Sequence, residues 1–352
     1  MRAWEKNCRR VEPYVPGEQP NIEGMIKLNT NENPYPPAPG VLQAIQDFNV
    51  DKLRLYPDDK STMLVESLAE YYKVDKEQVF VGVGSDDVLG MAFLSFFNSD
   101  KPILFPDITY SFYEVWANLY KIPYEMPALD EDFRIKKEDY YKENGGIILA
   151  NPNAPTGICE DLTFIEDILQ HNQDVIVIVD EAYIDFGGKS ALELIDRYEN
   201  LLVVQTFSKA RSMAGMRIGY AIGNKELIKI INDVKYSYNS YTMNQTSLYY
   251  GVEAVKDDAY FRENLAKIVE ERERTVVELE KLGFTCTDSK TNFLFVKHST
   301  VSAGDLLAML REKNIFVRRF ANSPRISNYL RISIGTKEEM DSLFAALKEY
   351  IE

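Results

Sequence analysis

The 352-residue sequence contains few of the residues that build disulfide frameworks or zinc sites. Its three cysteines lie far apart, and its two histidines, His171 and His298, have no cysteine cluster beside them. Neither a disulfide framework nor a metal site is therefore expected.

Basic residues are also outnumbered, 40 against 55 acidic ones, which leaves a net charge of −15. Because phosphate backbones attract basic surfaces, this balance argues against a nucleic-acid partner.

Long apolar runs are missing as well. No apolar stretch approaches the roughly 20 residues that cross a bilayer. The first residues, MRAWEKNCRRVEPYVPGE, carry basic side chains without the apolar centre of a signal peptide. The composition, 45% hydrophobic and 27% charged, is that of an ordinary globular protein. We therefore expect a cytoplasmic protein without membrane contact, long enough for one large or two unequal domains.

Short apolar stretches alternate with helical patterns from about residue 27 to residue 236. Stretches such as Gly146–Ala150 and Val175–Asp180 lack polar alternation, as expected of parallel strands covered on both faces. Ala191–Tyr198 is predicted to be one of the helices between strands. This order predicts an α/β fold with a parallel or mostly parallel sheet flanked by helices.

The last part of the chain has a different pattern. Residues 260–282 form a long charged helix, and mixed strands and helices follow, including a predicted strand at Ile315–Arg318 and a final helix from Lys337. Such a mixture is typical of a smaller α+β domain. The polar and aromatic stretch Tyr236–Asn244 is the predicted domain boundary.

Polar residues follow the ends of several predicted strands, where open α/β sheets bind ligands. Gly84 and Ser85 lie between a strand and a helix, where free backbone N–H groups favour an anion. A nicotinamide site is disfavoured because a third glycine of the dinucleotide-binding loop is replaced by Asp87. Asn153 follows another strand in a turn rich in proline. Asp180, at the end of a buried strand, either caps a helix or faces the protonated ring nitrogen of a cofactor.

The segment QTFSKARSMAGMRIG places Lys209 and Arg217 around small and apolar residues. A lysine after a strand is either a surface residue or a nucleophilic amine. Arg217, with the hydroxyls of Thr206 and Ser208, offers the forked cation and the donors that bind a phosphate. Taken together, these strand ends predict a single ligand-binding crevice.

The same residues belong to motifs that extend over nearly the whole chain. The motifs are NENP (31–34), LYP (55–57), GSDD (84–87), Tyr110, NPNAPTG (151–157), DEAY (180–183), TFSKARSMAGMRIGY (206–220) and LRISIG (330–335). Together they resemble the fold type I pyridoxal-phosphate aminotransferases. The VEPYVPGE start (11–18) and the GSDD loop are most similar to the histidinol-phosphate aminotransferase branch. The resemblance implies a large domain with a mostly parallel seven-stranded sheet and a smaller α+β domain.

The resemblance also implies the roles of the cofactor residues. Lys209 forms the internal aldimine with pyridoxal 5′-phosphate and transfers the proton, while Asp180 pairs with the ring nitrogen. Asn153 and Tyr183 bind the ring hydroxyl, and Tyr110 stacks on the ring. The implied phosphate ligands are Ser85, Asp86, Thr206, Ser208 and Arg217, with Tyr56 reaching the phosphate of the neighbouring subunit in a homodimer with shared sites.

On the substrate side, Arg331 matches the family's arginine for the substrate anion and Arg318 a second one. Tyr14, in an N-terminal segment that covers the substrate, and Asn33 of NENP are further candidates. Arg319 and Arg325 are additional cations nearby in the sequence. The implied division is an N-terminal segment of residues 1–29, a large domain of 30–240 and a small domain of 241–352.

The implied reaction converts histidinol phosphate and 2-oxoglutarate to imidazole-acetol phosphate and glutamate, in histidine biosynthesis. Alternatives within the same fold are an aromatic amino-acid aminotransferase and a threonine-phosphate decarboxylase. From another class, a non-catalytic ligand-sensing domain of this shape would carry a DNA-binding segment, and no basic or helix-turn-helix pattern precedes Lys27.

Overall fold

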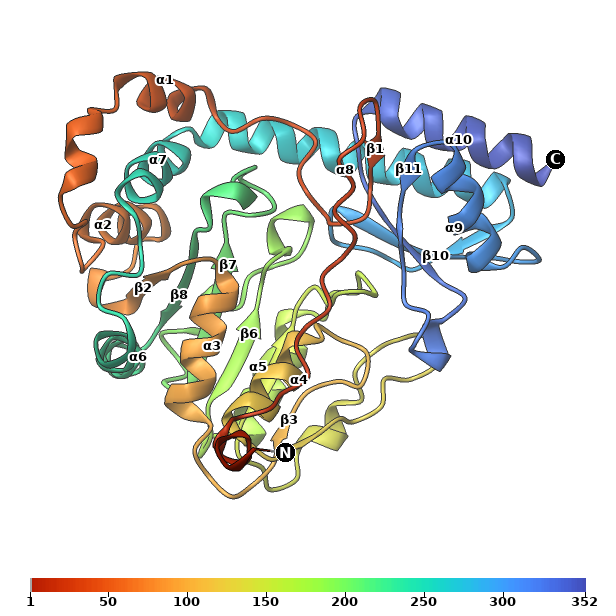
Figure 1. Cartoon of the computed structure of the whole chain (residues 1–352). Coiled ribbons are helices and arrows are strands. Elements are labelled where there is room, and N and C mark those ends of the chain that lie inside the picture. The colour runs from red at the N-terminus through yellow and green to blue at the C-terminus, as the bar shows by residue number, and fades with distance from the viewer. Residues whose placement is uncertain (1) are drawn as a thin grey trace.

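The computed structural model describes residues 2–352, and its largest sheet occupies the centre of the molecule (Figure 1). The seven strands of this sheet are β2 (Val79–Gly82), β3 (Ile103–Leu104), β4 (Tyr124–Glu125), β5 (Ile147–Ala150), β6 (Val177–Asp180), β7 (Leu201–Thr206) and β8 (Gly219–Gly223). They lie in the order β2-β8-β7-β6-β5-β3-β4. Strands β3 to β7 pair in parallel, whereas β8 is antiparallel to both β7 and β2. The predicted mostly parallel seven-stranded sheet is confirmed.

The sheet is covered by helices on both faces, which explains why its strands are apolar without alternation. In β5, Ile147 and Leu149 point into one core and Ile148 into the other. Helices α3 (Ser85–Phe96), α4 (Phe112–Tyr120) and α6 (Lys225–Tyr238) cover one face. Helices α1 (Pro39–Asp47), α2 (Thr62–Tyr72), α5 (Leu162–His171) and α7 (Gln245–Lys256) pack into the core of the other face.

The C-terminal part forms a second core around a four-stranded antiparallel sheet. Its strands, in the order β12-β13-β10-β9, are β9 (Phe284–Cys286), β10 (Phe293–His298), β12 (Arg318–Arg319) and β13 (Leu330–Ser333). Its helices are α8 (Asp258–Lys281), α9 (Ala303–Glu312) and α10 (Lys337–Ile351). A further two-stranded parallel sheet joins β1 (Ile26–Lys27) to β11 (Ile315–Phe316).

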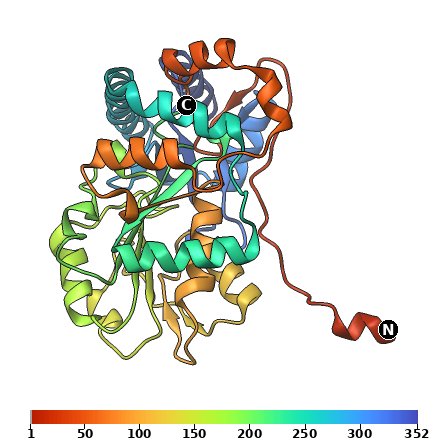
Figure 2. The same cartoon turned by 90° about the vertical axis from the view of Figure 1, so that its left-hand side faces the viewer.

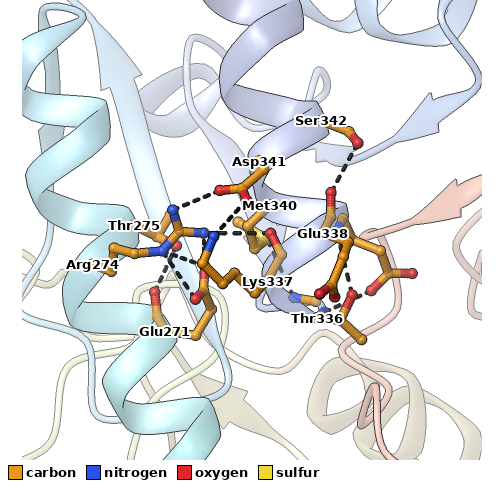
Figure 3. Close-up of polar contacts among 11 residues, drawn as sticks. Glu271, Arg274, Thr275, Thr336, Lys337, Glu338, Met340, Asp341 and Ser342 are labelled. Atoms are coloured by element: carbon orange, nitrogen blue, oxygen red, sulfur yellow. Dashed lines mark hydrogen bonds and ion pairs between the residues drawn. The ribbon is translucent and has the colours of Figure 1, made fainter.

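Helices α8 and α10 are held together by the charged cluster of Figure 3. Arg274 of α8 donates to Glu271 one turn earlier, at 3.0 Å from Nε, and to Asp341 of α10, at 2.7 Å from Nη1. A capping box between Thr336 and Glu339 fixes the start of α10. These contacts attach the long helix α8 to the C-terminal helix beside the small sheet.

Two local predictions were wrong. The predicted helix Ala191–Tyr198 is only a short 3₁₀ turn over Ala191–Leu194, because the backbone here closes tighter i,i+3 bonds, such as that from the Ile195 N–H to the Leu192 carbonyl. The predicted strand Ile315–Arg318 is two strands, since the chain changes partner at Val317: β11 pairs with β1 and β12 with β13.

The N-terminal segment is extended and lies against both parts of the molecule. Its first turn (Ala3–Asn7) projects away from the body, and the chain then returns towards β1 (Figure 2). Arg9 donates to the Leu119 carbonyl at 2.8 Å, and Glu18 forms an ion pair with Arg311 of α9. Within residues 2–352, no helix has the length and apolar character needed to cross a membrane.

Candidate active site

A cavity of about 240 Å³ lies at the carboxyl ends of β5, β6 and β7. A second cavity of about 320 Å³ shares Asp86, Tyr110, Tyr183 and Lys209 with it, so the two form one continuous crevice. The strand ends meet here because parallel strands bring their carboxyl ends to one edge of a sheet. The crevice predicted from the sequence is therefore present in the structure.

The first cavity contains a cradle suited to an anion. Helix α3 begins at Ser85 after Gly84, which has a φ of +83° and no capping side chain, so the first N–H groups of the helix remain available. The loop lies so close to β8 that a Cβ on Gly219 would come within 2.2 Å of the Ser85 nitrogen. Gly219 also pairs with Thr206 across β7 and β8. Two glycines thus let two backbone segments meet beside the cavity.

Hydroxyl and guanidinium donors complete this cradle. Thr206 Oγ1 lies 3.0 Å from Ser208 Oγ, and both side chains line the cavity. Arg217 reaches the same wall from a residue with a φ of +52°, and its Nη2 lies 3.4 Å from Asp86 Oδ2. An uncapped helix, two hydroxyls and one arginine are the donor set that a phosphate requires. The residues present therefore fit a phosphorylated cofactor.

Asp180 forms a different kind of wall at the end of β6. Its Oδ2 accepts from the Tyr113 hydroxyl at 2.8 Å, and its Oδ1 accepts from the Ala182 N–H at 3.2 Å. Burial raises the pKa of Asp180 to about 6, despite these two hydrogen bonds and the charge of Lys209. A buried carboxylate without a direct ion pair is stabilised when a ligand brings a positive charge to it. The protonated ring nitrogen of a pyridine cofactor would be such a ligand group.

Lys209 lies between these walls. Its Nζ donates to the Thr30 carbonyl at 3.3 Å and lies 5.6 Å from the centre of the Tyr183 ring. The backbone around it is fixed by Asn33, whose Nδ2 lies 3.1 Å from the Lys209 carbonyl oxygen and 3.2 Å from that of Ala210. Because the Thr30 carbonyl is the only hydrogen-bond partner of this amine among residues 2–352, the amine can react with an aldehyde without first breaking an ion pair.

The aromatic residues of the site are held by hydrogen bonds of their hydroxyls or by ring stacking. The Tyr110 hydroxyl donates to Asp86 Oδ1 at 2.8 Å, and burial raises the pKa of this phenol well above its usual value. The Tyr183 hydroxyl accepts from Asn31 Nδ2 at 2.9 Å. Tyr14, from the N-terminal segment, stacks on Phe112 with the ring centres 4.2 Å apart. These contacts place Tyr110, Tyr183 and Tyr14 along the wall of the crevice.

The second cavity ends at two arginines of the small sheet. Arg331 Nη2 donates to the Asn29 carbonyl at 3.1 Å, while its buried Nε has no hydrogen-bond partner among the described residues. Burial lowers the pKa of Arg331, as does the nearby charge of Arg318. Arg318 donates to the Pro16 carbonyl at 3.4 Å and lies over the Phe320 ring. A half-buried guanidinium whose Nε is buried and unused suits the carboxylate or phosphate of a substrate.

Three predicted site residues do not line the crevice of this chain. The amide of Asn33 holds the backbone at Lys209 and does not line the crevice. Asn153 lies beside the crevice, but its amide is used by Thr109, Thr156 and the Ile108 carbonyl. Tyr56 is 82% exposed on the surface.

The two additional arginines are also accounted for. Arg319 donates to the Ser327 carbonyl at 2.9 Å, and Arg325 pairs with Asp107 at 2.7 Å. Neither lines the crevice.

Some residues of the site escaped the sequence analysis. Tyr113 binds Asp180 from α4, and Asn31 binds Tyr183 from the segment after β1. Gln19 and Glu32 line the first cavity. The only available signals were the positions of Tyr113, three residues after Tyr110, and of Asn31, within NENP.

A family model described as aminotransferase class I and II matches residues 23–347. The chain belongs to this family. It is 53% identical to a histidinol-phosphate aminotransferase of Clostridium botulinum over 99% of both chains. It is 51% identical to one of Lactococcus lactis subsp. cremoris over 99% of this chain and 98% of the relative. The histidinol-phosphate aminotransferase of Sinorhizobium meliloti, solved in complex with pyridoxal-5′-phosphate, aligns with a TM-score of 0.84 and 25% identity over 93% of this chain and 90% of that one.

This aminotransferase is therefore an enzyme that uses pyridoxal phosphate, as the sequence predicted. Its crevice provides a phosphate cradle and a buried carboxylate on either side of a lysine, which matches the functional groups of that cofactor. No three His, Cys, Asp or Glu side chains among residues 2–352 are grouped to hold a metal ion.

Proposed function

We propose that this enzyme transfers the amino group of histidinol phosphate to 2-oxoglutarate, giving imidazole-acetol phosphate and glutamate. The observation that carries the proposal is a second anion site, at Arg318 and Arg331, across the crevice from the phosphate cradle at α3. One cradle suits the cofactor phosphate, and the other suits a substrate anion. The full-length identity to relatives named histidinol-phosphate aminotransferase supports the choice of substrate.

Specific residues would hold the cofactor in this proposal. Its phosphate would bind the N–H groups of Ser85 and Asp86, the hydroxyls of Thr206 and Ser208, and Arg217. Asp180 would face the ring nitrogen, with Tyr113 and Ala182 keeping the carboxylate in place. Tyr110 would cover one side of the ring, and Tyr183 would lie at the ring hydroxyl. Asn153 would reach this hydroxyl by exchanging one of its present hydrogen bonds, to Thr109, Thr156 or the Ile108 carbonyl. When bound, pyridoxal phosphate supplies an aldehyde and an electron-accepting ring that acidifies the Cα–H of an amine substrate.

The chain itself would move the proton. Lys209 Nζ, whose hydrogen bond in the structure is to the Thr30 carbonyl, would take the proton from the substrate Cα as a general base. As a general acid it would then deliver this proton to the aldehyde carbon of the cofactor, which leaves the substrate as its keto product. Arg331 and Arg318 fix the anionic end of the substrate, so that its Cα–H faces this amine. Tyr14 and Gln19 of the N-terminal segment cover the crevice and exclude water. Because one anion site serves both substrates, the product of the first must leave before 2-oxoglutarate enters.

The proposal is tested by the visible absorbance of the purified, cofactor-loaded enzyme. Histidinol phosphate should abolish the absorbance band, 2-oxoglutarate should restore it, and imidazole-acetol phosphate and glutamate should accumulate in equal amounts. Lys209→Ala should show no turnover, whereas Lys267→Ala, at a lysine on α8 paired with Glu263, should behave like the natural enzyme. Turnover by Lys209→Ala would refute the proton transfer.

The alternatives give different products. Release of carbon dioxide from threonine phosphate would indicate a decarboxylase of the same fold. Loss of the band with phenylalanine far faster than with histidinol phosphate would indicate an aromatic amino-acid aminotransferase. Either result would overturn the substrate and leave the cofactor residues in place.

We further propose a cytoplasmic homodimer with shared active sites. Tyr56 is 82% exposed and stacks on Tyr241 with the ring centres 4.8 Å apart. Leu53 and Leu55, beside it, are also more than half exposed, which is unusual for large apolar side chains unless a partner covers them. Light scattering should give twice the mass of 40.4 kDa, and Leu53→Glu should shift the protein to monomers.

The cytoplasmic location is supported by the three free cysteines, which agree with a reducing compartment.

The domain division also stays a proposal, with one adjustment. Helix α7 packs in the core of the large sheet, through residues such as Leu248 and Val252. We therefore place the boundary at Asp257, between α7 and α8, rather than at residue 240. The segment up to residue 29 stays a separate covering segment.

A further inference from the structure

Asn31 makes four hydrogen bonds at the junction between the two sheets. Its Nδ2 donates to the Tyr183 hydroxyl at 2.9 Å, and its backbone N–H donates to Ser333 Oγ at 2.9 Å. Its carbonyl accepts from Asn292 Nδ2 at 3.0 Å. Tyr183 follows β6 of the large sheet, whereas Asn292 and Ser333 belong to the small sheet or precede it. Asn31 therefore links the cofactor wall to the sheet that carries Arg331.

The hydrogen bonds around Asn31 have a fixed direction. Ser333 Oγ accepts from the Asn31 N–H, so its own hydrogen is free to reach Asn31 Oδ1, at 3.2 Å. With the oxygen of the amide defined in this way, the NH₂ end must face Tyr183. The Tyr183 oxygen is then an acceptor, and its hydrogen remains for a partner in the crevice. Successive donors of this kind polarise one another and strengthen the last one.

The backbone at Asn31 is also specialised. Its φ is +57°, a left-handed conformation that asparagine tolerates better than most residues, and the residue is 1% exposed. A buried residue in this conformation, with its amide and both backbone groups bonded, holds its side chain in one position. The same segment fixes Lys209, through the Thr30 carbonyl and through Asn33.

We propose that Asn31 is a positioning residue, which orients the Tyr183 hydroxyl into the crevice and strengthens it as a hydrogen-bond donor. The inference rests on the proposed function, in which Tyr183 contacts the cofactor ring hydroxyl. Donation from Tyr183 stabilises the deprotonated ring oxygen. Losing Asn31 weakens this donation, so the proton affinity of the bound cofactor rises.

The experiment is a pH titration of the visible absorbance of the cofactor-loaded enzyme without substrate. Asn31→Gly removes the amide and keeps the left-handed backbone free of strain. We expect the midpoint to rise by about 0.5 pH unit or more, roughly a threefold change in proton affinity. Tyr183→Phe should shift the midpoint in the same direction, and adding Asn31→Gly to Tyr183→Phe should produce no further shift.

Two further variants sharpen the test. Asn31→Asp keeps the size of the side chain but presents an acceptor to the Tyr183 hydroxyl, drawing its hydrogen away from the crevice, so the midpoint should again rise. Asn314→Gly is the matched control: Asn314 is exposed and has a φ of +58°, and it lies at the turn before β11. It should leave the midpoint unchanged. The inference would be overturned if neither Asn31 variant shifted the midpoint. It would also be overturned if Asn31→Gly shifted the midpoint equally in the natural enzyme and in the Tyr183→Phe variant.

The titration uses no substrate, so its outcome is separate from the choice of substrate. If the natural enzyme fails to convert histidinol phosphate while the Asn31 shifts appear as expected, the proposed reaction is wrong and the positioning role stands. If the enzyme converts histidinol phosphate but Asn31 does not influence the midpoint through Tyr183, the positioning role alone is wrong.

Discussion

Replacing Asp180 with asparagine should make the cofactor-free protein more stable while weakening its hold on the cofactor. Burial raises the pKa of Asp180 to about 6, from a usual value near 3.8. A carboxyl group that binds its proton more tightly in the folded state destabilises that state as pH rises through the two pKa values. The asparagine variant has the same shape and carries no such penalty.

The magnitude follows from the two pKa values. A difference of about 2 units corresponds to a penalty of about 3 kcal/mol once the pH exceeds the folded pKa, at 1.36 kcal/mol per unit. At pH 4.5 the unfolded carboxyl is mostly ionised and the folded one is mostly protonated, so the penalty is about 1 kcal/mol. The stability advantage of Asp180→Asn should therefore grow by about 2 kcal/mol between pH 4.5 and pH 8.

The measurement is urea unfolding of both cofactor-free proteins at these two pH values. The change between the two pH values is the informative quantity, because any loss of hydrogen bonding to Tyr113 or Ala182 in the variant contributes equally at both. Asp196→Asn, at an exposed carboxylate, is the control and should show no such growth. If the stability difference between the variant and the natural protein is the same at pH 4.5 and pH 8, the pKa of Asp180 is not raised in the folded protein.

Three other substitutions test separate parts of the molecule. In a cofactor titration, Gly219→Ala should weaken binding roughly tenfold or more, because its Cβ would lie 2.2 Å from the neighbouring loop. Gly215→Ala is the control: a Cβ there meets nothing within 4 Å, so this variant should bind the cofactor normally. In steady-state assays, Arg331→Gln should raise KM for histidinol phosphate and for 2-oxoglutarate about 10- to 100-fold and should change kcat less. The reason is that the charge-assisted hydrogen bond to the substrate anion is lost. Arg325→Gln, outside the crevice, should not raise KM. Arg211→Met should lower the free energy of urea unfolding by about 2 to 4 kcal/mol, since the buried guanidinium lies over three aromatic rings and donates to the Ala254 carbonyl at 2.7 Å.

The sequence predicted the parts of the fold that depend on local composition. Doubly covered strands need apolar residues on both faces, so they could be recognised without alternation. The direction of β8 could not be predicted, because an apolar strand has the same composition whether it runs parallel or antiparallel. Residues 207–218 form a compact turn that brings β8 back beside β7, and this turn contains Lys209 and Arg217.

The sequence could predict those site residues that lie at the ends of strands and line the crevice themselves. Asp180, Ser208 and Lys209 are of this kind, and the structure places them along one cavity. Residues that act through another side chain could not be found, because their contacts span long sequence separations. Tyr113 and Asp180 are 67 residues apart, and Asn31 and Tyr183 are 152 apart. Only the folded chain brings such pairs together.

The crevice contains charged side chains of both signs, Asp180 and Arg331, that form no ion pair with any of the residues that the structure describes. Burial raises the pKa of Asp180 and lowers that of Arg331, so both charges are less well solvated in the folded protein than in water. The two charges do not neutralise each other, because Asp180 lines the first cavity and Arg331 the second. Each can then be compensated only by a ligand of opposite charge: a cationic ring at Asp180 and an anionic substrate at Arg331. Binding of the cofactor at Asp180 and of a substrate anion at Arg331 would therefore compensate two charges that folding alone leaves uncompensated.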